Sequence, residues 1–135
     1  MKRIIIVFLL MILLTGCIKD KESDKKMYVI VNNIKYEIDL ENNETVKELY
    51  NKLPLDFEMN ELNGNEKYVY LDYEIASNPV SVDRIEKGDI MLYGDNCLVL
   101  FYKSFTTQYS YTKIGHINNL EDLGIGNITI RLEKE

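Results

Sequence analysis

The chain has 135 residues, of which 16 are basic and 22 acidic, and a formal charge of −6 at neutral pH. Nucleic acid is therefore not expected as a partner, because its phosphates select basic surfaces. One histidine and two cysteines are too few for a zinc site or a disulfide framework. The sequence has no calcium-loop spacing and no glycine-rich phosphate motif, so we expect no metal and no cofactor. The composition predicts one domain stabilised by a hydrophobic core.

The first residues predict export and lipid attachment. Lys2 and Arg3 precede an apolar run from Ile4 to Leu14, and Thr15-Gly16-Cys17 follows. About 11 apolar residues reach roughly half-way across a ~30 Å hydrocarbon core, which is typical of a signal peptide rather than a permanent span. The run from Leu14 to Cys17 resembles the bacterial lipobox, which implies cleavage before Cys17 and acylation of that cysteine, palmitate included. The alternative is a plain secretory signal with a coincidental cysteine.

We therefore expect three parts: a lipoprotein signal peptide at 1–16, lipidated Cys17 with a polar tether at 17–26, and a folded domain at 27–135. Two basic residues leave with the signal, so 14 basic residues remain against 22 acidic ones, a formal charge of −8. Such a surface does not bind anionic lipid, so attachment depends on the acyl chains. The expected location is the extracytoplasmic face of the cell membrane.

Alternation of apolar and polar residues predicts strands over most of the domain. Residues 27–31 and 34–41 flank Asn32-Asn33, which suits a tight hairpin turn. Apolar residues at helical spacing predict one helix that ends before Pro54; they are Val46, Leu49, Tyr50 and Leu53. Further strands are expected at 55–60, 67–73, 90–93, 97–102 and 128–133, with a connecting loop at 76–87 and a single helical turn at 118–123. Seven or eight short strands with frequent turns predict a barrel or a sandwich.

The run Cys97–Tyr102 is apolar on both faces, so we expect both faces to be covered and Cys97 to be a small buried hydrophobe. The following segment to Tyr111 combines aromatic and small hydroxyl residues, a composition suited to a peptide or small ligand. The candidate ligand-binding residues are Phe101, Tyr102, Lys103, Phe105, Tyr109 and Tyr111. The alternative is that these aromatics seal one end of the barrel. A hydrolase built on Ser104, Ser110 and His116 is not expected, because no nucleophile elbow surrounds either serine.

Four segments together resemble the bacterial and archaeal cyclophilin-like proteins over residues 27–133. They are Leu62–Tyr68, Gly88–Gly94, Asn96–Phe105 and Tyr109–Thr112. The resemblance implies a mostly β fold: a closed eight-stranded cyclophilin-like β-barrel with one short α-helix.

Cyclophilins isomerise X-Pro bonds with an arginine, a hydrophobic proline pocket and a glutamine, in the motifs Phe-His-Arg and Phe-x-x-Gln-Gly. Phe101-Tyr102-Lys103 and Phe105-Thr106-Thr107-Gln108 match parts of these motifs, which makes Lys103, Phe105 and Gln108 the candidate catalytic residues. Lys103 replaces the arginine without its planar fork of donors. We therefore expect a membrane-anchored domain that binds a peptide or small molecule. The alternatives are a peptidyl-prolyl isomerase or folding assistant for exported proteins, and an assembly module with an exposed apolar patch.

Overall fold

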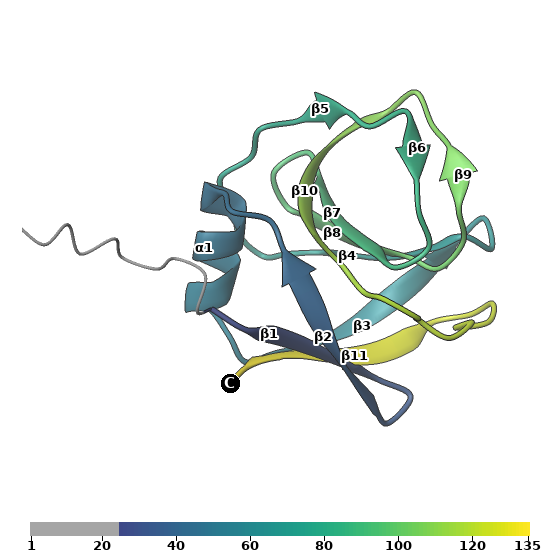
Figure 1. The fold of residues 1–135 in the computed structure, drawn as a ribbon, viewed down its shortest axis with the longest axis horizontal. Helices are drawn as coiled ribbons and strands as arrows, with labels where there is room; N and C mark the ends of the chain where they lie inside the picture. The colour runs from purple at the N-terminus through teal and green to yellow at the C-terminus, as the bar shows by residue number, and fades with distance from the viewer. Residues whose placement is uncertain (1–24) are drawn as a thin grey trace, which may run out of the picture.

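The computed structural model of the protein describes residues 25–135. The expected signal peptide, Cys17 and most of the tether lie outside the described residues. Eight antiparallel strands follow one another around a barrel in the order β2-β1-β11-β3-β4-β8-β7-β10, and β10 pairs with β2 to close it (Figure 1). Their bounds are β1 (Met27–Val31), β2 (Ile34–Leu40), β3 (Leu55–Leu62), β4 (Glu66–Tyr70), β7 (Asp89–Tyr93), β8 (Cys97–Phe101), β10 (Ser110–His116) and β11 (Ile128–Lys134). The prediction of a closed, mostly β barrel is confirmed.

The hairpin between β1 and β2 follows directly from local sequence. Asn32 and Asn33 have φ values of 50° and 62°, the left-handed conformation that a two-residue hairpin turn requires and that asparagine tolerates. Val31 consequently pairs with Ile34. The alternating apolar residues of both strands then face the barrel interior.

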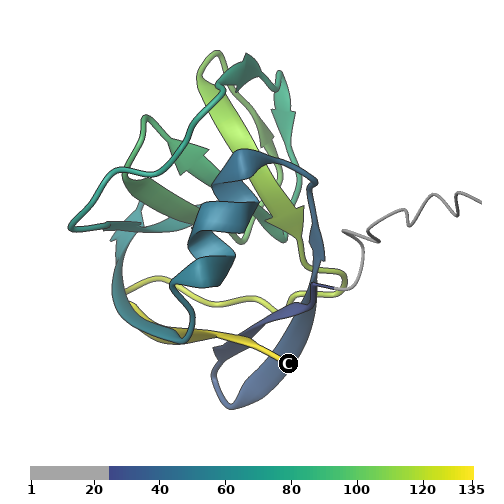
Figure 2. The same cartoon turned by 90° about the vertical axis from the view of Figure 1, so that its left-hand side faces the viewer.

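The helix α1 (Glu44–Asn51) lies across one opening of the barrel, as Figure 2 shows. The side chain of Asn43 caps its first turn by accepting a hydrogen bond from the Val46 amide at 2.9 Å. Val46 and Leu49 are buried against the strands. The chain leaves the helix before Pro54, as the sequence predicts.

Two local predictions are wrong. Residues 118–123 contain a tight turn at Asn118–Asn119 and irregular backbone instead of a helical turn. Asn119 has a φ of 59°, a left-handed conformation that cannot continue an α-helix. The segment expected to be a plain loop at 76–87 contains two short strands, β5 (Val80–Ser81) and β6 (Arg84–Ile85).

Strand β8 separates two hydrophobic clusters. Leu98 and Leu100 point into the main core inside the barrel, whereas Val99 and Phe101 belong to a smaller outer cluster. The outer cluster is covered by two excursions of the chain. One carries β5 and β6, and the other carries β9 (Phe105–Thr106), which pairs with β6. The three short strands lie together at the top of the view in Figure 1, and the predicted burial of both faces of β8 is confirmed.

Candidate functional site

The outer face of β4, β8, β7 and β10 is hollowed along β8, which lies between β4 and β7. The strand register places Tyr68 and Tyr70 of β4 opposite Val99 and Cys97 of β8, and it places Tyr93 of β7 on the other side of Cys97. Because the central side chains are much smaller than the tyrosines on either side, the face is concave. The hollow has a volume of about 280 Å³. We call it the aromatic trough, and it is lined by Leu62, Glu66, Tyr68, Tyr70, Tyr93, Cys97, Val99, Tyr109 and Tyr111.

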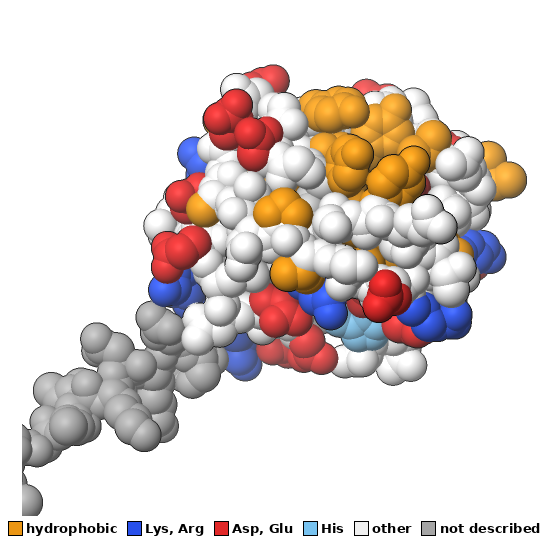
Figure 3. Space-filling view, turned by 90° about the horizontal axis from the view of Figure 1, so that it is seen from above, with side chains coloured by type: hydrophobic (Ala, Val, Ile, Leu, Met, Phe, Trp, Pro, Cys, Tyr) orange, Lys and Arg blue, Asp and Glu red, His pale blue; other side chains and the backbone are white. Residues whose placement is uncertain are grey.

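Tyrosine rings form the walls of the trough and pack against one another. The ring of Tyr93 lies 6.0 Å from that of Tyr109 and 5.6 Å from that of Tyr111, centroid to centroid. Even so, Tyr70 and Tyr109 are each 63% exposed, and Tyr93 is 45% exposed. Figure 3 shows hydrophobic side chains gathered in one region of the face seen from above, with charged side chains spread elsewhere. Gathered apolar surface of this kind marks a contact site more often than a single exposed residue does.

A second hollow of about 480 Å³ continues from the trough. It shares Leu62, Glu66, Tyr109 and Tyr111 with the trough. Its other lining residues are mostly amides and hydroxyls: Asn63, Asn65, Phe105, Thr106, Thr107 and Gln108. We call it the amide-lined hollow. The two hollows together offer aromatic faces beside hydrogen-bonding groups.

Glu66 lines both hollows. It is the first residue of β4, and its cross-strand partner is Phe101. Burial, followed by the negative charge of Glu61, raises the pKa of Glu66. Among residues 25–135 no lysine, arginine or histidine forms an ion pair with this carboxylate.

The same environment raises the pKa of two neighbours of Glu66, the thiol of Cys97 and the hydroxyl of Tyr111. Burial, followed by the charge of Glu66, raises the pKa of Cys97 to about 11 and that of Tyr111 to about 12. A thiol with so high a pKa is a poor nucleophile at neutral pH. The expectation that Cys97 is a small buried hydrophobe is confirmed by its burial.

The residues predicted from the segment 101–111 divide among three places. Phe101 is fully buried behind the trough, and Tyr102 is fully buried on the opposite side of the strand, inside the barrel. Tyr109 and Tyr111 line both hollows.

The three candidate catalytic residues do not meet at one point. Phe105 and Gln108 both line the amide-lined hollow. Lys103 lines neither hollow and is paired with Asp122 at 2.9 Å.

Tyr102 belongs to a polar network that the sequence analysis did not find. The ammonium group of Lys67 is fully buried and contacts the Glu61 carboxylate at 2.7 Å and the carbonyl oxygen of Gly124 at 2.6 Å. It also donates to the carbonyl oxygen of Gly126 and lies 4.6 Å from the centre of the Tyr102 ring. The Tyr102 hydroxyl donates to Glu61 in turn. All donors of Lys67 are thus satisfied, and the network holds the loop before β11 against the barrel.

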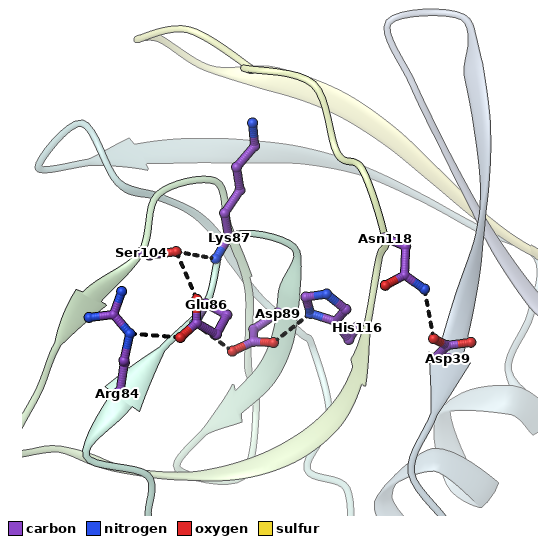
Figure 4. Close-up of polar contacts among 8 residues, drawn as sticks. All are labelled: Asp39, Arg84, Glu86, Lys87, Asp89, Ser104, His116 and Asn118. Carbon is purple, nitrogen blue, oxygen red and sulfur yellow. Dashed lines mark hydrogen bonds and ion pairs between the residues drawn. The ribbon is translucent and has the colours of Figure 1, made fainter.

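A further polar cluster joins the start of β7 to the excursions (Figure 4). His116 Nδ1 lies 2.8 Å from one carboxylate oxygen of Asp89. The other oxygen of that carboxylate accepts a hydrogen bond from the Glu86 amide. The Ser104 hydroxyl lies 3.2 Å from Glu86. Ser104 and His116 therefore bond to different partners, and the cluster contains no serine–histidine pair.

The described residues offer no metal centre, because residues 25–135 contain no group of three or more His, Cys, Asp or Glu side chains that could hold an ion. In the same part of the chain, no helix has the length and apolar character needed to cross a membrane.

The architecture defines the folded part of the chain as a small closed barrel, one outer face of which is partly covered by the excursions and otherwise hollowed into the aromatic trough. The sequence model of the cyclophilin-like family matches residues 29–133. The chain therefore belongs to the cyclophilin-like family, as predicted. The model of the prokaryotic membrane lipoprotein lipid attachment site matches residues 1–17, which confirms that the protein is a lipid-anchored membrane protein.

A solved structure supports the fold. The protein is similar to the hypothetical protein AF2241 from Archaeoglobus fulgidus with a TM-score of 0.55 and 20% sequence identity, and the match covers 82% of this chain and 95% of that one. At this identity the similarity shows the fold alone. A comparison with curated proteins found no match.

Proposed function

We propose that the protein is a binding domain, held by lipid on Cys17 at the extracytoplasmic face of the membrane, that presents the aromatic trough to a peptide or small ligand. The observation that supports this most directly is the set of three exposed tyrosines, Tyr70, Tyr93 and Tyr109, around a concave floor. Tyrosine combines a large apolar face with a polar tip at low entropic cost, which suits a contact surface.

The expected tether is long enough for this role. A fully extended segment with the length of residues 18–26 would span roughly 30 Å at about 3.3 Å per residue, which is enough to hold the barrel clear of the lipid headgroups. The trough would then face the space outside the membrane, where peptides and small solutes are accessible.

Binding is the favoured proposal because most groups of the trough are unreactive at neutral pH. Its thiol and its buried tyrosine have pKa values near 11 and 12. No lysine or arginine of the described residues lines either hollow. Glu66 is the one acidic side chain of the trough, and a single carboxylate among tyrosine rings suits the binding of a ligand.

The binding proposal is tested with an array of random short peptides probed with the full chain in non-ionic detergent micelles. We expect a subset of peptides to bind the wild-type protein and to lose binding to Tyr109→Ala. The matched control is Tyr28→Ala, a tyrosine of β1 that lines neither hollow. Equal binding by Tyr109→Ala, or no bound peptide and no bound compound in a fragment screen, would contradict the proposal.

Prolyl isomerisation is the second candidate, and one observation favours it: Phe105 and Gln108 line the same hollow. The test measures cis–trans isomerisation of a chromogenic X-Pro peptide by the same preparation. Acceleration that is lost in Gln108→Ala but kept in Lys103→Ala, which changes a residue outside both hollows, would establish an isomerase at this site. Absence of acceleration in a folded protein would leave the binding role.

A further inference from the structure

The trough contains one negative charge without a partner. Glu66 lies where the trough and the amide-lined hollow meet. Two lysines close to it in the fold form ion pairs elsewhere: Lys67, the next residue, pairs with Glu61 inside the barrel, and Lys103, two residues beyond the cross-strand partner Phe101, pairs with Asp122. A partly buried carboxylate loses hydration, and within residues 25–135 nothing replaces it, so a bound cation would recover interaction energy there.

The walls of the trough also favour a cation. Five tyrosines, at positions 68, 70, 93, 109 and 111, line the hollow that contains Glu66. The face of an aromatic ring attracts a cation electrostatically, and it does so more strongly when the pair is removed from water. Weakly hydrated organic cations gain most from such a site, because inorganic ions keep their water.

The amide-lined hollow indicates that the cation carries hydrogen-bond donors. The side-chain carbonyl oxygen of Asn65, which lines this hollow, is buried and has no donor among residues 25–135. With Glu66, this makes two acceptors that lack donors in one region. A quaternary ammonium group has no N–H to offer them, whereas guanidinium has five in a planar fork.

We propose that the trough binds the guanidinium group of an arginine side chain, with its plane against the tyrosine rings and its N–H groups on the Glu66 carboxylate. This inference rests on the proposed binding function and names the chemistry of the ligand. Guanidinium matches a carboxylate in a bidentate manner and stacks on aromatic faces, which a lysine ammonium group does less well. The mature formal charge of −8 would also attract such a ligand at low ionic strength.

The test is a calorimetric titration of the full chain in non-ionic detergent micelles with N-acetyl-arginine amide, N-acetyl-citrulline amide and N-acetyl-lysine amide. Citrulline has almost the shape of arginine but no charge, so the comparison isolates the cation on the unaltered protein. We expect the arginine probe to bind at least about tenfold more tightly than the citrulline and lysine probes, which is about 1.4 kcal/mol.

Two variants locate the effect. Glu66→Gln should lower the affinity for the arginine probe at least about tenfold. The control Glu58→Gln removes a carboxylate of β3 outside both hollows and should leave that affinity unchanged. Equal binding of arginine and citrulline, equal binding of arginine and lysine, or unaltered binding by Glu66→Gln would overturn the inference. If no probe binds, the guanidinium inference also fails, and the peptide array decides the binding role separately. If citrulline binds as tightly as arginine and Tyr109→Ala abolishes both, the trough is a binding site for neutral ligands.

Discussion

Replacement of Lys67 by methionine should strongly destabilise the barrel. The Lys67 side chain is 1% exposed, and its partner Glu61 is 15% exposed. Lys67→Met keeps the volume but leaves the Glu61 carboxylate without its cation, with only the Tyr102 hydroxyl and the Gly64 amide as donors, and it removes the donor from two loop carbonyl oxygens. Breaking a buried ion pair in this way costs about 3–5 kcal/mol, and each kcal/mol lowers Tm by about 4 °C in a domain of this size. We therefore expect Tm to fall by about 12–20 °C.

The assay is thermal unfolding followed by circular dichroism, with Lys103→Met as the matched control. The pair between Lys103 and Asp122 is 50% and 59% exposed, and exposed pairs contribute at most about 1 kcal/mol. The double variant Lys67→Met with Glu61→Gln should recover part of the lost stability, because it leaves no unpaired charge. A Tm for Lys67→Met equal to that of Lys103→Met would refute the reasoning.

The same network predicts a pH dependence. Burial acts to raise the pKa of Glu61, but hydrogen bonds from Lys67 and Tyr102 outweigh it, so the pKa lies below the ordinary value of 4.5. A group with a lowered pKa stabilises the fold above its unfolded value and loses that contribution as pH falls through the folded value. The Tm difference between wild type and Lys67→Met should therefore be full at pH 6 and shrink in acid below about pH 4.5. A difference that stays constant down to pH 2 would contradict this assignment.

Three further predictions concern single positions. Gly88→Ala should destabilise the protein far more than Gly64→Ala. Both glycines have a positive φ, but only at Gly88 would an added Cβ lie 2.2 Å from a backbone carbonyl oxygen, that of Ile117. Equal midpoints of urea unfolding for the two variants would show that this overlap is relieved. Iodoacetamide at pH 8 should label Cys97 only after unfolding, because burial raises its pKa to about 11; rapid labelling of the folded protein would disagree. Cys17→Ala should move the protein from the membrane fraction to the soluble fraction, and retention in the membrane would count against lipid anchoring at that residue.

Local features of the sequence determined much of the fold. The Asn32-Asn33 turn and the alternation around it predict the first hairpin, and the stripe from Val46 to Leu53 predicts the helix. These predictions succeed because turn conformation and side-chain periodicity depend on residues adjacent in the chain. The lipid attachment site is equally local, since a few consecutive residues before Cys17 carry it.

Only the tertiary structure decided where a ligand could bind. The sequence indicates the segment from Phe101 to Tyr111 as a whole, but alternation along the chain turns Tyr102 into the barrel and Phe101 to the outer face, where Tyr111 of β10 also lies. Pairing of β4 and β7 with β8 brings Tyr70 and Tyr93 beside Cys97. Glu66 and Lys67, adjacent in sequence, lie on opposite faces of β4, one as an unpaired charge in the trough and the other as a satisfied cation inside the barrel. Strand register is a non-local property, so no pattern within one strand shows which residues of other strands will lie beside it.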